Sequence, residues 1–210
     1  MTAGGRLEAA LAAIDARNAE DPVRIVVDGQ PRPKELAHAE LVTEWVRRLD
    51  PDADEAQLLA ARAHHLRRWA LPRADYPDGR AGYLRWRTEA KKRHATEVAE
   101  VLAEVGYDAA TIERVQAIIT KRGLGTDAAV QVHEDALCLV FLQTQLDDLV
   151  AQLGEERSVE VLAKTARKMS AAAVAVAAEL PLSSDGRRML LAAVDTDADA
   201  APASTRLRKE

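Results

Sequence analysis

Apolar residues recur at helical spacing along most of this chain, and this periodicity constrains its fold more than any other feature. Near the start, Leu7, Ala10, Leu11 and Ile14 follow the i, i+3, i+4, i+7 pattern of one helix face. The apolar residues are mainly Ala, Leu and Val, and the chain has only ten glycines among 210 residues. Because Ala and Leu are strong helix formers, the pattern predicts an α-helical protein.

Proline, glycine and aspartate divide the chain into seven or eight predicted helices. In the stretch "DPVRIVVDGQPRP", prolines and an Asp-Gly pair bound the short β-type run "RIVV", which indicates an extended loop or a fragment of a strand pair. The predicted helices lie near residues 4–18, 33–49, 54–69, 80–105, 107–123, 126–152, 158–180 and 184–194.

Short connections between helices favour an all-α bundle. We predict a single domain over residues 1–194. The last segment, "DTDADAAPASTRLRKE", has no apolar periodicity, so we predict a disordered C-terminal tail over residues 195–210.

Positive charge is concentrated in one part of the chain. Residues 62–93 contain ten basic and three acidic side chains, although the whole chain has a net charge of −5. A local positive field on an acidic body favours a compact anionic ligand over a long nucleic acid, which the remaining surface would repel. Alternatively, these side chains belong to solvated helix faces and pair with acids elsewhere.

Several metal-type ligands fall on apolar helix faces or at helix ends. His38 shares a face with apolar residues, His64 and His65 are adjacent near the end of a predicted helix, and Asp135 shares a face with Cys138. A buried carboxylate is costly unless it is paired or binds a cation, so these residues suit a divalent metal. They could equally be core histidines with hydrogen bonds and an aspartate paired with an arginine.

The order of these residues resembles the HD-domain superfamily of all-α proteins. The stretches "KELAHAELVTEWV", "LLAARAHHLRRW" and "HEDALCLVFL" correspond to its first histidine, its His-Asp pair and its later aspartate. More closely, "HHLRRW", "KKRHA", "QVHEDALCLVFL" and "KTARKMS" resemble an uncharacterised family, domain of unknown function 4202, over about residues 6–192. The resemblance implies an HD-like helical bundle.

The resemblance also implies a metal held by His38, His64 and Asp135. Position 65 carries His where the HD pattern has an Asp that can bridge two metals, which favours one divalent Mn, Fe or Zn ion over two. His65 is then a fourth ligand or a residue beside the ligands. His94, flanked by cations, is a candidate substrate contact or proton donor, and we assign His94 and His65 the catalytic roles. His133 and Glu134 are expected to point away from Asp135.

Arginine, lysine and tyrosine side chains near His64 suit a phosphorylated ligand, because guanidinium groups bind phosphate in a bidentate manner and aromatic faces stack on bases or sugars. The predicted substrate-binding residues are Arg67, Arg68, Arg73, Tyr76, Arg87, Lys91, Lys92 and Arg93. Lys121 and Arg122, at the end of a predicted helix, are expected to complement its dipole, although they could also line the site.

Three functions are compatible with these features. The first is a metal-dependent hydrolase acting on a small phosphorylated metabolite or nucleotide. The second is a mononuclear iron oxygenase, because two histidines and one carboxylate suit ferrous iron. The third is a non-catalytic module that binds an anion, a nucleotide or RNA. The single Cys138 and the acidic N-terminus, which has no apolar signal block, predict a cytoplasmic protein without a membrane partner.

Overall fold

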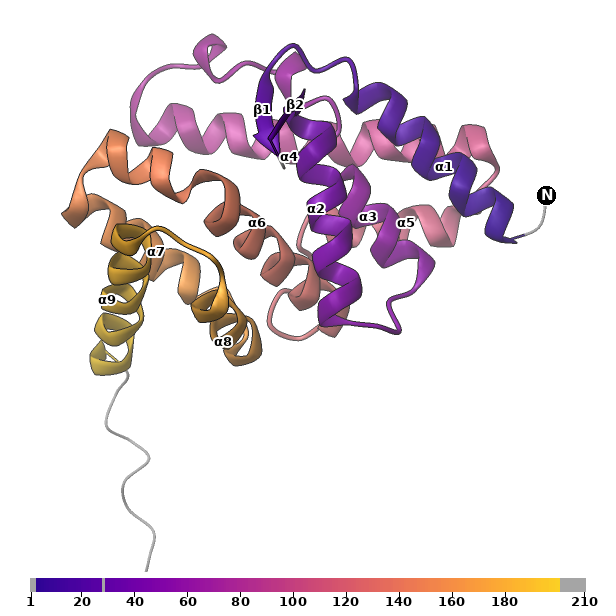
Figure 1. The fold of residues 1–210 in the computed structure, drawn as a ribbon. Coiled ribbons are helices and arrows are strands. Elements are labelled where there is room, and N and C mark those ends of the chain that lie inside the picture. The colour runs from indigo at the N-terminus through magenta and orange to yellow at the C-terminus, as the bar shows by residue number, and fades with distance from the viewer. Residues whose placement is uncertain (1–2, 28, 201–210) are drawn as a thin grey trace, which may run out of the picture. The chain divides into compact units, whose positions relative to one another are not determined.

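The computed structural model describes residues 3–27 and 29–200, and these residues form an all-α protein with one short β-hairpin (Figure 1). The predicted fold class is therefore confirmed. The chain divides into two compact units, residues 1–137 and 138–210, with the division inside one long helix. The prediction of one domain over residues 1–194 did not anticipate this division. Whether both units form a single folding domain stays a prediction.

The first unit contains five complete helices, the hairpin and the start of a sixth helix. Figure 1 shows α1 beside α3 and α4, and α5 beside α3 and α4. The elements are α1 (Ala3–Asn18), β1 (Arg24–Val27), β2 (Gln30–Pro33), α2 (Lys34–Leu49), α3 (Glu55–Ala63), α4 (Gly79–Val105), α5 (Ala109–Ile119) and the beginning of α6 (Ala128–Leu153).

The core of this unit is built from the apolar faces that the periodicity predicts. Ile14 of α1, Leu59 of α3, Leu102 of α4 and Ile118 of α5 are fully buried in one cluster. Leu66, which follows α3, lies in the same cluster. Burial of each such side chain contributes about 2 kcal/mol to folding.

The segment after α3 differs from the prediction of a helix continuing to residue 69. The helix ends at Ala63, and Arg67 has a left-handed backbone with φ of 51°. The buried side chain of Asn18, at the end of α1, accepts a hydrogen bond from the Arg67 N–H at 3.1 Å. This tertiary contact replaces helix continuation, so His64 and His65 lie at a turn.

A second buried polar residue fixes the start of α2. Asp21 accepts hydrogen bonds from the backbone N–H groups of Val23 and Glu35, both at 2.9 Å. The intervening β1 and β2 pair in antiparallel register, with Val27 opposite Gln30. The sequence indicated this extended segment but left its pairing open, and the pairing sets where α2 begins.

The long helix α4 begins against a preceding turn and ends at a glycine. A Cβ atom on Gly82 would lie 1.8 Å from the carbonyl oxygen of Pro77, so only glycine fits this contact. Gly106 ends the helix with φ of 88°, the left-handed cap conformation that glycine adopts without penalty. Both ends agree with the predicted span.

The second unit contains the rest of α6 and three further helices, α7 (Glu155–Ala166), α8 (Ala171–Glu179) and α9 (Ser184–Ala200). Both α7 and α8 pack against α9. The single helix predicted over residues 158–180 is two helices, because the Ser170 side chain accepts a hydrogen bond from the Ala173 N–H and starts a new one. The described residues therefore contain nine α-helices, slightly more than predicted.

The predicted tail begins inside α9, which continues to Ala200 instead of ending near residue 194. The rest of the predicted tail, residues 201–210, lies outside the described residues.

Candidate functional site

All five histidines of the chain lie in one region of the first unit, which we name the histidine cluster: His38, His64, His65, His94 and His133. The ring centroids of His64 and His65 are 4.1 Å apart. Those of His65 and His94 are 5.6 Å apart, and those of His64 and His133 are 6.4 Å apart. His38 is close enough to lower the pKa of both His64 and His65 electrostatically.

Four separate parts of the chain contribute to the histidine cluster. His38 comes from α2, His64 and His65 from the turn after α3, His94 from the middle of α4, and His133 from the start of α6. Except for His65, whose side chain is one-third exposed, these histidines are buried. The cluster therefore depends on the packing of four elements.

Hydrogen-bond partners determine which ring nitrogen of three histidines carries the proton. His64 Nδ1 lies 3.1 Å from the carbonyl oxygen of Ala61, and His94 Nδ1 lies 3.0 Å from that of Leu66. A carbonyl can only accept, so both Nδ1 atoms donate. His65 Nε2 lies 2.8 Å from an Arg68 nitrogen, which can only donate. All three histidines therefore use Nε2 as the accepting nitrogen.

The environment of the histidine cluster holds its imidazoles in the neutral form. Burial lowers the pKa of His94 to about 4 and that of His133 to about 3. Burial and neighbouring charges also lower the pKa values of His64 and His65 well below the usual range. Neutral imidazole is the form that acts as a metal ligand or a general base.

Two ring nitrogens in the cluster are buried without a hydrogen-bond partner among the described residues: His94 Nε2 and His133 Nδ1. A buried polar atom without a partner costs about 1–3 kcal/mol. Such atoms are rare in native proteins and call for an explanation, for which an unseen ion, water or ligand is a normal candidate.

Two buried glutamates border the histidine cluster. Glu35 is buried, and its Oε2 lies 3.4 Å from His65 Nδ1. Burial raises the pKa of Glu35, while Arg68 acts in the opposite direction. On the other side, the Lys121 ammonium forms an ion pair with the buried carboxylate of Glu134.

Backbone strain also marks this region. Arg67 and Lys121, with φ of 51° and 58°, are the two non-glycine residues with positive φ among the described residues. Arg67 lies between His65 and Arg68 in the turn, and Lys121 pairs with Glu134, the neighbour of His133. Strained backbone of this kind costs about 1–3 kcal/mol and concentrates at functional sites.

The predicted metal ligands His38, His64 and Asp135 are all buried, and their role as a ligand set stays a prediction. Asp135 follows His133 by two residues, which separates their side chains by about 200° around a helix. His133 points towards His64, while Asp135 accepts a hydrogen bond from Gln131 at 2.9 Å. Within residues 3–27 and 29–200, no three His, Cys, Asp or Glu side chains are placed to hold an ion.

The catalytic candidates His65 and His94 both belong to the histidine cluster, although their roles stay predictions. Glu35, His133 and Glu134 are neighbours of the cluster without a predicted role in it, and all three are buried. Two signals could have indicated them. Glu35 precedes His38 by one helical turn, and His133 follows Val130 at the same apolar spacing.

The predicted substrate-binding residues separate into two groups. Several have structural partners: Arg73 donates to the carbonyls of Tyr76 and Pro77, Arg93 binds Glu97 and the carbonyl of Ala70, and Arg67 lies 3.8 Å from Glu97. Tyr76 contributes its carbonyl to the Arg73 contact.

Arg68, Arg87 and Lys91 remain near the histidine cluster. Arg68 lies over the Trp86 ring and contacts His65, and Arg87 lies over the Tyr83 ring. Lys91 donates to the carbonyl of Thr120 at 2.8 Å. Lys92, which is exposed like Lys91, lies about 100° further around α4.

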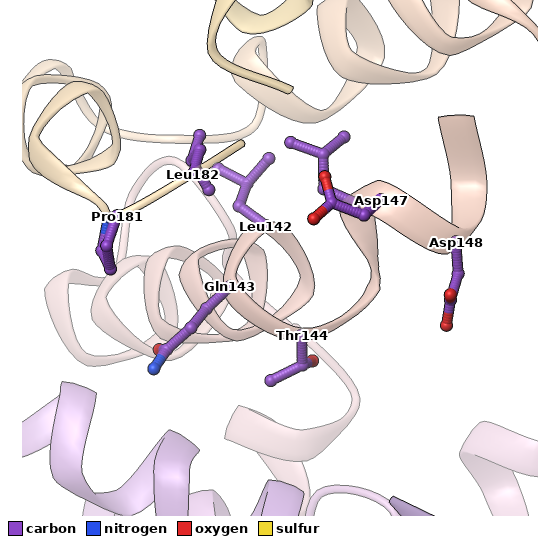
Figure 2. Close-up of a pocket in the computed structure, with 8 residues that line it drawn as sticks. Leu142, Gln143, Thr144, Asp147, Asp148, Pro181 and Leu182 are labelled. Atoms are coloured by element: carbon purple, nitrogen blue, oxygen red, sulfur yellow. The ribbon is translucent and has the colours of Figure 1, made fainter. Parts of the chain in front are cut away.

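The second unit has a hollow with an empty volume of about 360 Å³, lined by side chains of α6 and the segment before α9 (Figure 2). Its Asp147 carboxylate accepts a hydrogen bond from Ser183 Oγ at 2.6 Å, and Ser183 Oγ accepts one from the Gly186 N–H. No histidine or basic side chain lines this hollow. Asp147 and Ser183 therefore position the start of α9.

One helix in the described residues, α6, is long and apolar enough by length and composition to cross a membrane. Core helices of soluble proteins pass the same test, and α6 carries His133, Glu134 and Asp135 on consecutive positions. Charged and polar residues at these positions are costly in a bilayer. The helix is thus weak support for a membrane segment.

The fold and the histidine cluster define an all-α protein with a buried, imidazole-rich site. The family model described as Domain of unknown function (DUF4202) matches residues 8–190, and the chain belongs to this family. No curated protein and no solved structure matches the chain. The likeness to the HD-domain superfamily rests on the sequence motifs alone.

Proposed function

We propose that this protein is a metal-dependent hydrolase of a small phosphorylated metabolite or nucleotide, and that the histidine cluster holds its ion. The observation that carries the proposal is the gathering of all five histidines from four elements, with three accepting Nε2 atoms. Burying neutral imidazoles beside strained backbone opposes stability. Such an arrangement is typical of a functional site.

The donor chemistry of the histidine cluster fits a divalent ion. Neutral imidazole is a good ligand for Zn, Fe and Mn, and the Nδ1 hydrogen bonds of His64 and His94 to carbonyls are typical of ligands that bind through Nε2. Two imidazoles on one tetrahedral ion have ring centroids about 5 Å apart. The observed separations of 4.1–6.4 Å bracket this value, but the rings must reorient before three of them share one ion.

His64 and His94 are the leading ligands, with His38 or His133 completing the set. A bound divalent ion would polarise a phosphoryl oxygen and lower the pKa of water. Arg68, whose guanidinium contacts His65, would bind the anion. Glu35 lies on the other side of His65, with its Oε2 3.4 Å from Nδ1.

Metal analysis of protein purified without chelator tests this proposal. We expect about one divalent ion per chain, loss of the ion in His64→Ala and His94→Ala, and hydrolysis of phosphate esters that depends on the ion. The ligand set derived from sequence alone predicts loss in Asp135→Ala, whereas the histidine cluster predicts retention. A protein that stays metal-free after incubation with Mn, Fe and Zn would contradict the proposal.

A non-catalytic anion-binding module is the second candidate. It is favoured by the Arg68 guanidinium, which occupies His65 Nε2, and by the absence of three converging ligands within the described residues. This function predicts that phosphate raises the melting temperature equally with and without a chelator and that no ester is hydrolysed. Iron in the purified protein, together with oxygen consumption, would instead support the oxygenase predicted as another alternative.

A further inference from the structure

Four cationic side chains act electrostatically on one another or on the histidine cluster, and we name them the cationic strip: Arg68, Arg87, Lys91 and Lys121. Two buried carboxylates lie beside them: Glu134 pairs with Lys121, and Glu35, which contacts His65, acts electrostatically on Arg68. The strip therefore carries more positive charge than its acidic neighbours neutralise.

Hydrogen bonds and ion pairs connect the strip to the cluster step by step. The Lys91 ammonium donates to the carbonyl of Thr120, which places it beside the next residue, Lys121. Lys121 pairs with Glu134, whose neighbour His133 faces His64. At the other end, Arg68 contacts His65.

Lys91 of α4 and Lys121 of the turn after α5 are thus held near one another. Like charges at short range repel, and burial together with Lys121 lowers the pKa of Lys91. Lys121 also has a strained backbone, with φ of 58°. The repulsion between the two lysines and the strained backbone of Lys121 are both unfavourable. Such features are expected at a site where a bound anion offsets the repulsion.

We infer that the ligand of this site carries a condensed phosphate, with one phosphoryl group beside Arg68 and the histidine cluster and a second between Lys91 and Lys121. This inference deepens the proposed function, because it names the ligand class of the same site. A phosphate monoester brings a charge of only about −1.5 to −2 at pH 7. If a divalent ion binds beside the cationic strip, one phosphate monoester does not neutralise their combined positive charge. Further phosphoryl groups would supply the missing negative charge.

Titration calorimetry of the full chain with tripolyphosphate and with orthophosphate tests the inference, in EDTA and in Mn²⁺. We expect tripolyphosphate to bind at least about tenfold more tightly in both buffers, since it makes one or more additional charge-assisted contacts. ADP and pyrophosphate are included as a pair with the same number of phosphoryl groups, because Tyr83, beneath Arg87, offers an exposed ring to a base. Tighter binding of ADP than pyrophosphate identifies a nucleotide source, and equal binding identifies the free condensed phosphate.

Lys91→Gln is expected to weaken tripolyphosphate binding by about tenfold and to leave orthophosphate binding within about twofold. The double variant Lys121→Gln, Glu134→Gln is expected to weaken tripolyphosphate binding by a similar factor. Because both partners of the ion pair are replaced, no buried charge is left unpaired. Arg80→Gln and Arg85→Gln are matched controls, because both side chains are exposed on α4 and neither belongs to the cationic strip or to the predicted substrate-binding residues. Neither control should change binding by more than about twofold.

Equal affinities for the two phosphates, or equal losses in the control variants, would overturn the inference. These outcomes are distinct from a failure of the proposed hydrolase. If the protein is metal-free and inactive but still prefers tripolyphosphate through Lys91, the condensed-phosphate site is supported and the proposed hydrolase is not. If the protein binds metal and hydrolyses esters but shows no preference for tripolyphosphate, the proposed hydrolase is supported and the condensed-phosphate ligand is refuted.

Discussion

At the scale of single residues, several features that lower the stability of the folded protein lie around the histidine cluster. Arg67 and Lys121 adopt left-handed backbone conformations, and His94 and His133 bury ring nitrogens without hydrogen-bond partners among the described residues. Each feature alone costs about 1–3 kcal/mol. Their coincidence beside the histidine cluster is the strongest reason to look for function there.

The neutral histidines predict that the metal-free protein loses stability in mild acid. The folded pKa of His94 is about 4 and that of His133 about 3, both below the unfolded value of about 6.5. The unfolded chain therefore binds more protons below pH 6.5, and stability that is present above this pH falls as the pH approaches 4. Urea unfolding in EDTA at pH 7, 5.5 and 4.5 should show a loss of a few kcal/mol.

His94→Gln provides the comparison for this experiment. It removes one titrating group from the cluster, so its free energy of unfolding should change less between pH 7 and pH 4.5 than that of the native protein. An unchanged pH dependence would show that His94 does not contribute to the acid sensitivity.

At the scale of elements, two polar residues at the end of α1 organise the site from a distance. Asn18 holds the turn that carries His64 and His65, and Asp21 holds the start of α2, which carries Glu35 and His38. Both side chains are 1% exposed. Their contacts join segments far apart in the sequence, which explains why the predicted helix to residue 69 is wrong at its end.

Replacement of Asn18 by alanine should loosen the turn. The Arg67 N–H loses its acceptor, and we expect a loss of about 1–2 kcal/mol in the free energy of unfolding together with weaker anion binding. Asp54→Ala is the control, since it removes the capping box of α3, which costs about 1 kcal/mol at the opposite end of that helix. Equal anion affinity in native protein and both variants would argue against this role of Asn18.

The start of α4 gives a second prediction at this scale. Gly82→Ala places a Cβ atom against the Pro77 carbonyl and should destabilise the protein by at least about 1–3 kcal/mol. Gly4→Ala makes the same change in α1, where no atom lies within 4 Å, and should be neutral or stabilising by up to about 1 kcal/mol. Melting temperatures of the two variants should shift in opposite directions or differ by several degrees.

At the scale of the whole molecule, charge distribution limits the partners. The chain has a net charge of −5, although residues 62–93 are basic. Many of these basic side chains have structural partners, such as Arg93 with Glu97. The available positive charge is therefore short in extent, which suits a compact anion better than a polyanion.

We accordingly expect no binding to duplex DNA at 150 mM salt, while condensed phosphate still binds. Fluorescence anisotropy with a labelled duplex of about two helical turns would measure this. Micromolar binding with a steep salt dependence would instead indicate many phosphate contacts and a nucleic-acid partner.

The sequence by itself determined the α-helical class and most helix boundaries. Helical periodicity, prolines and the glycine at 106 are local signals, and the structure confirms them. Whether the protein is a cytoplasmic hydrolase stays a prediction, because neither the family nor the fold assigns an activity.

Only the tertiary structure decided which side chains meet. Asn18 ends a helix that the local pattern would continue, Ser170 divides another, and the packing of α6 brings the His133 ring to that of His64. Helical spacing gives the direction of a side chain relative to its own axis, but the rotation of one helix against another depends on packing contacts between distant segments. The histidine cluster is the product of that packing.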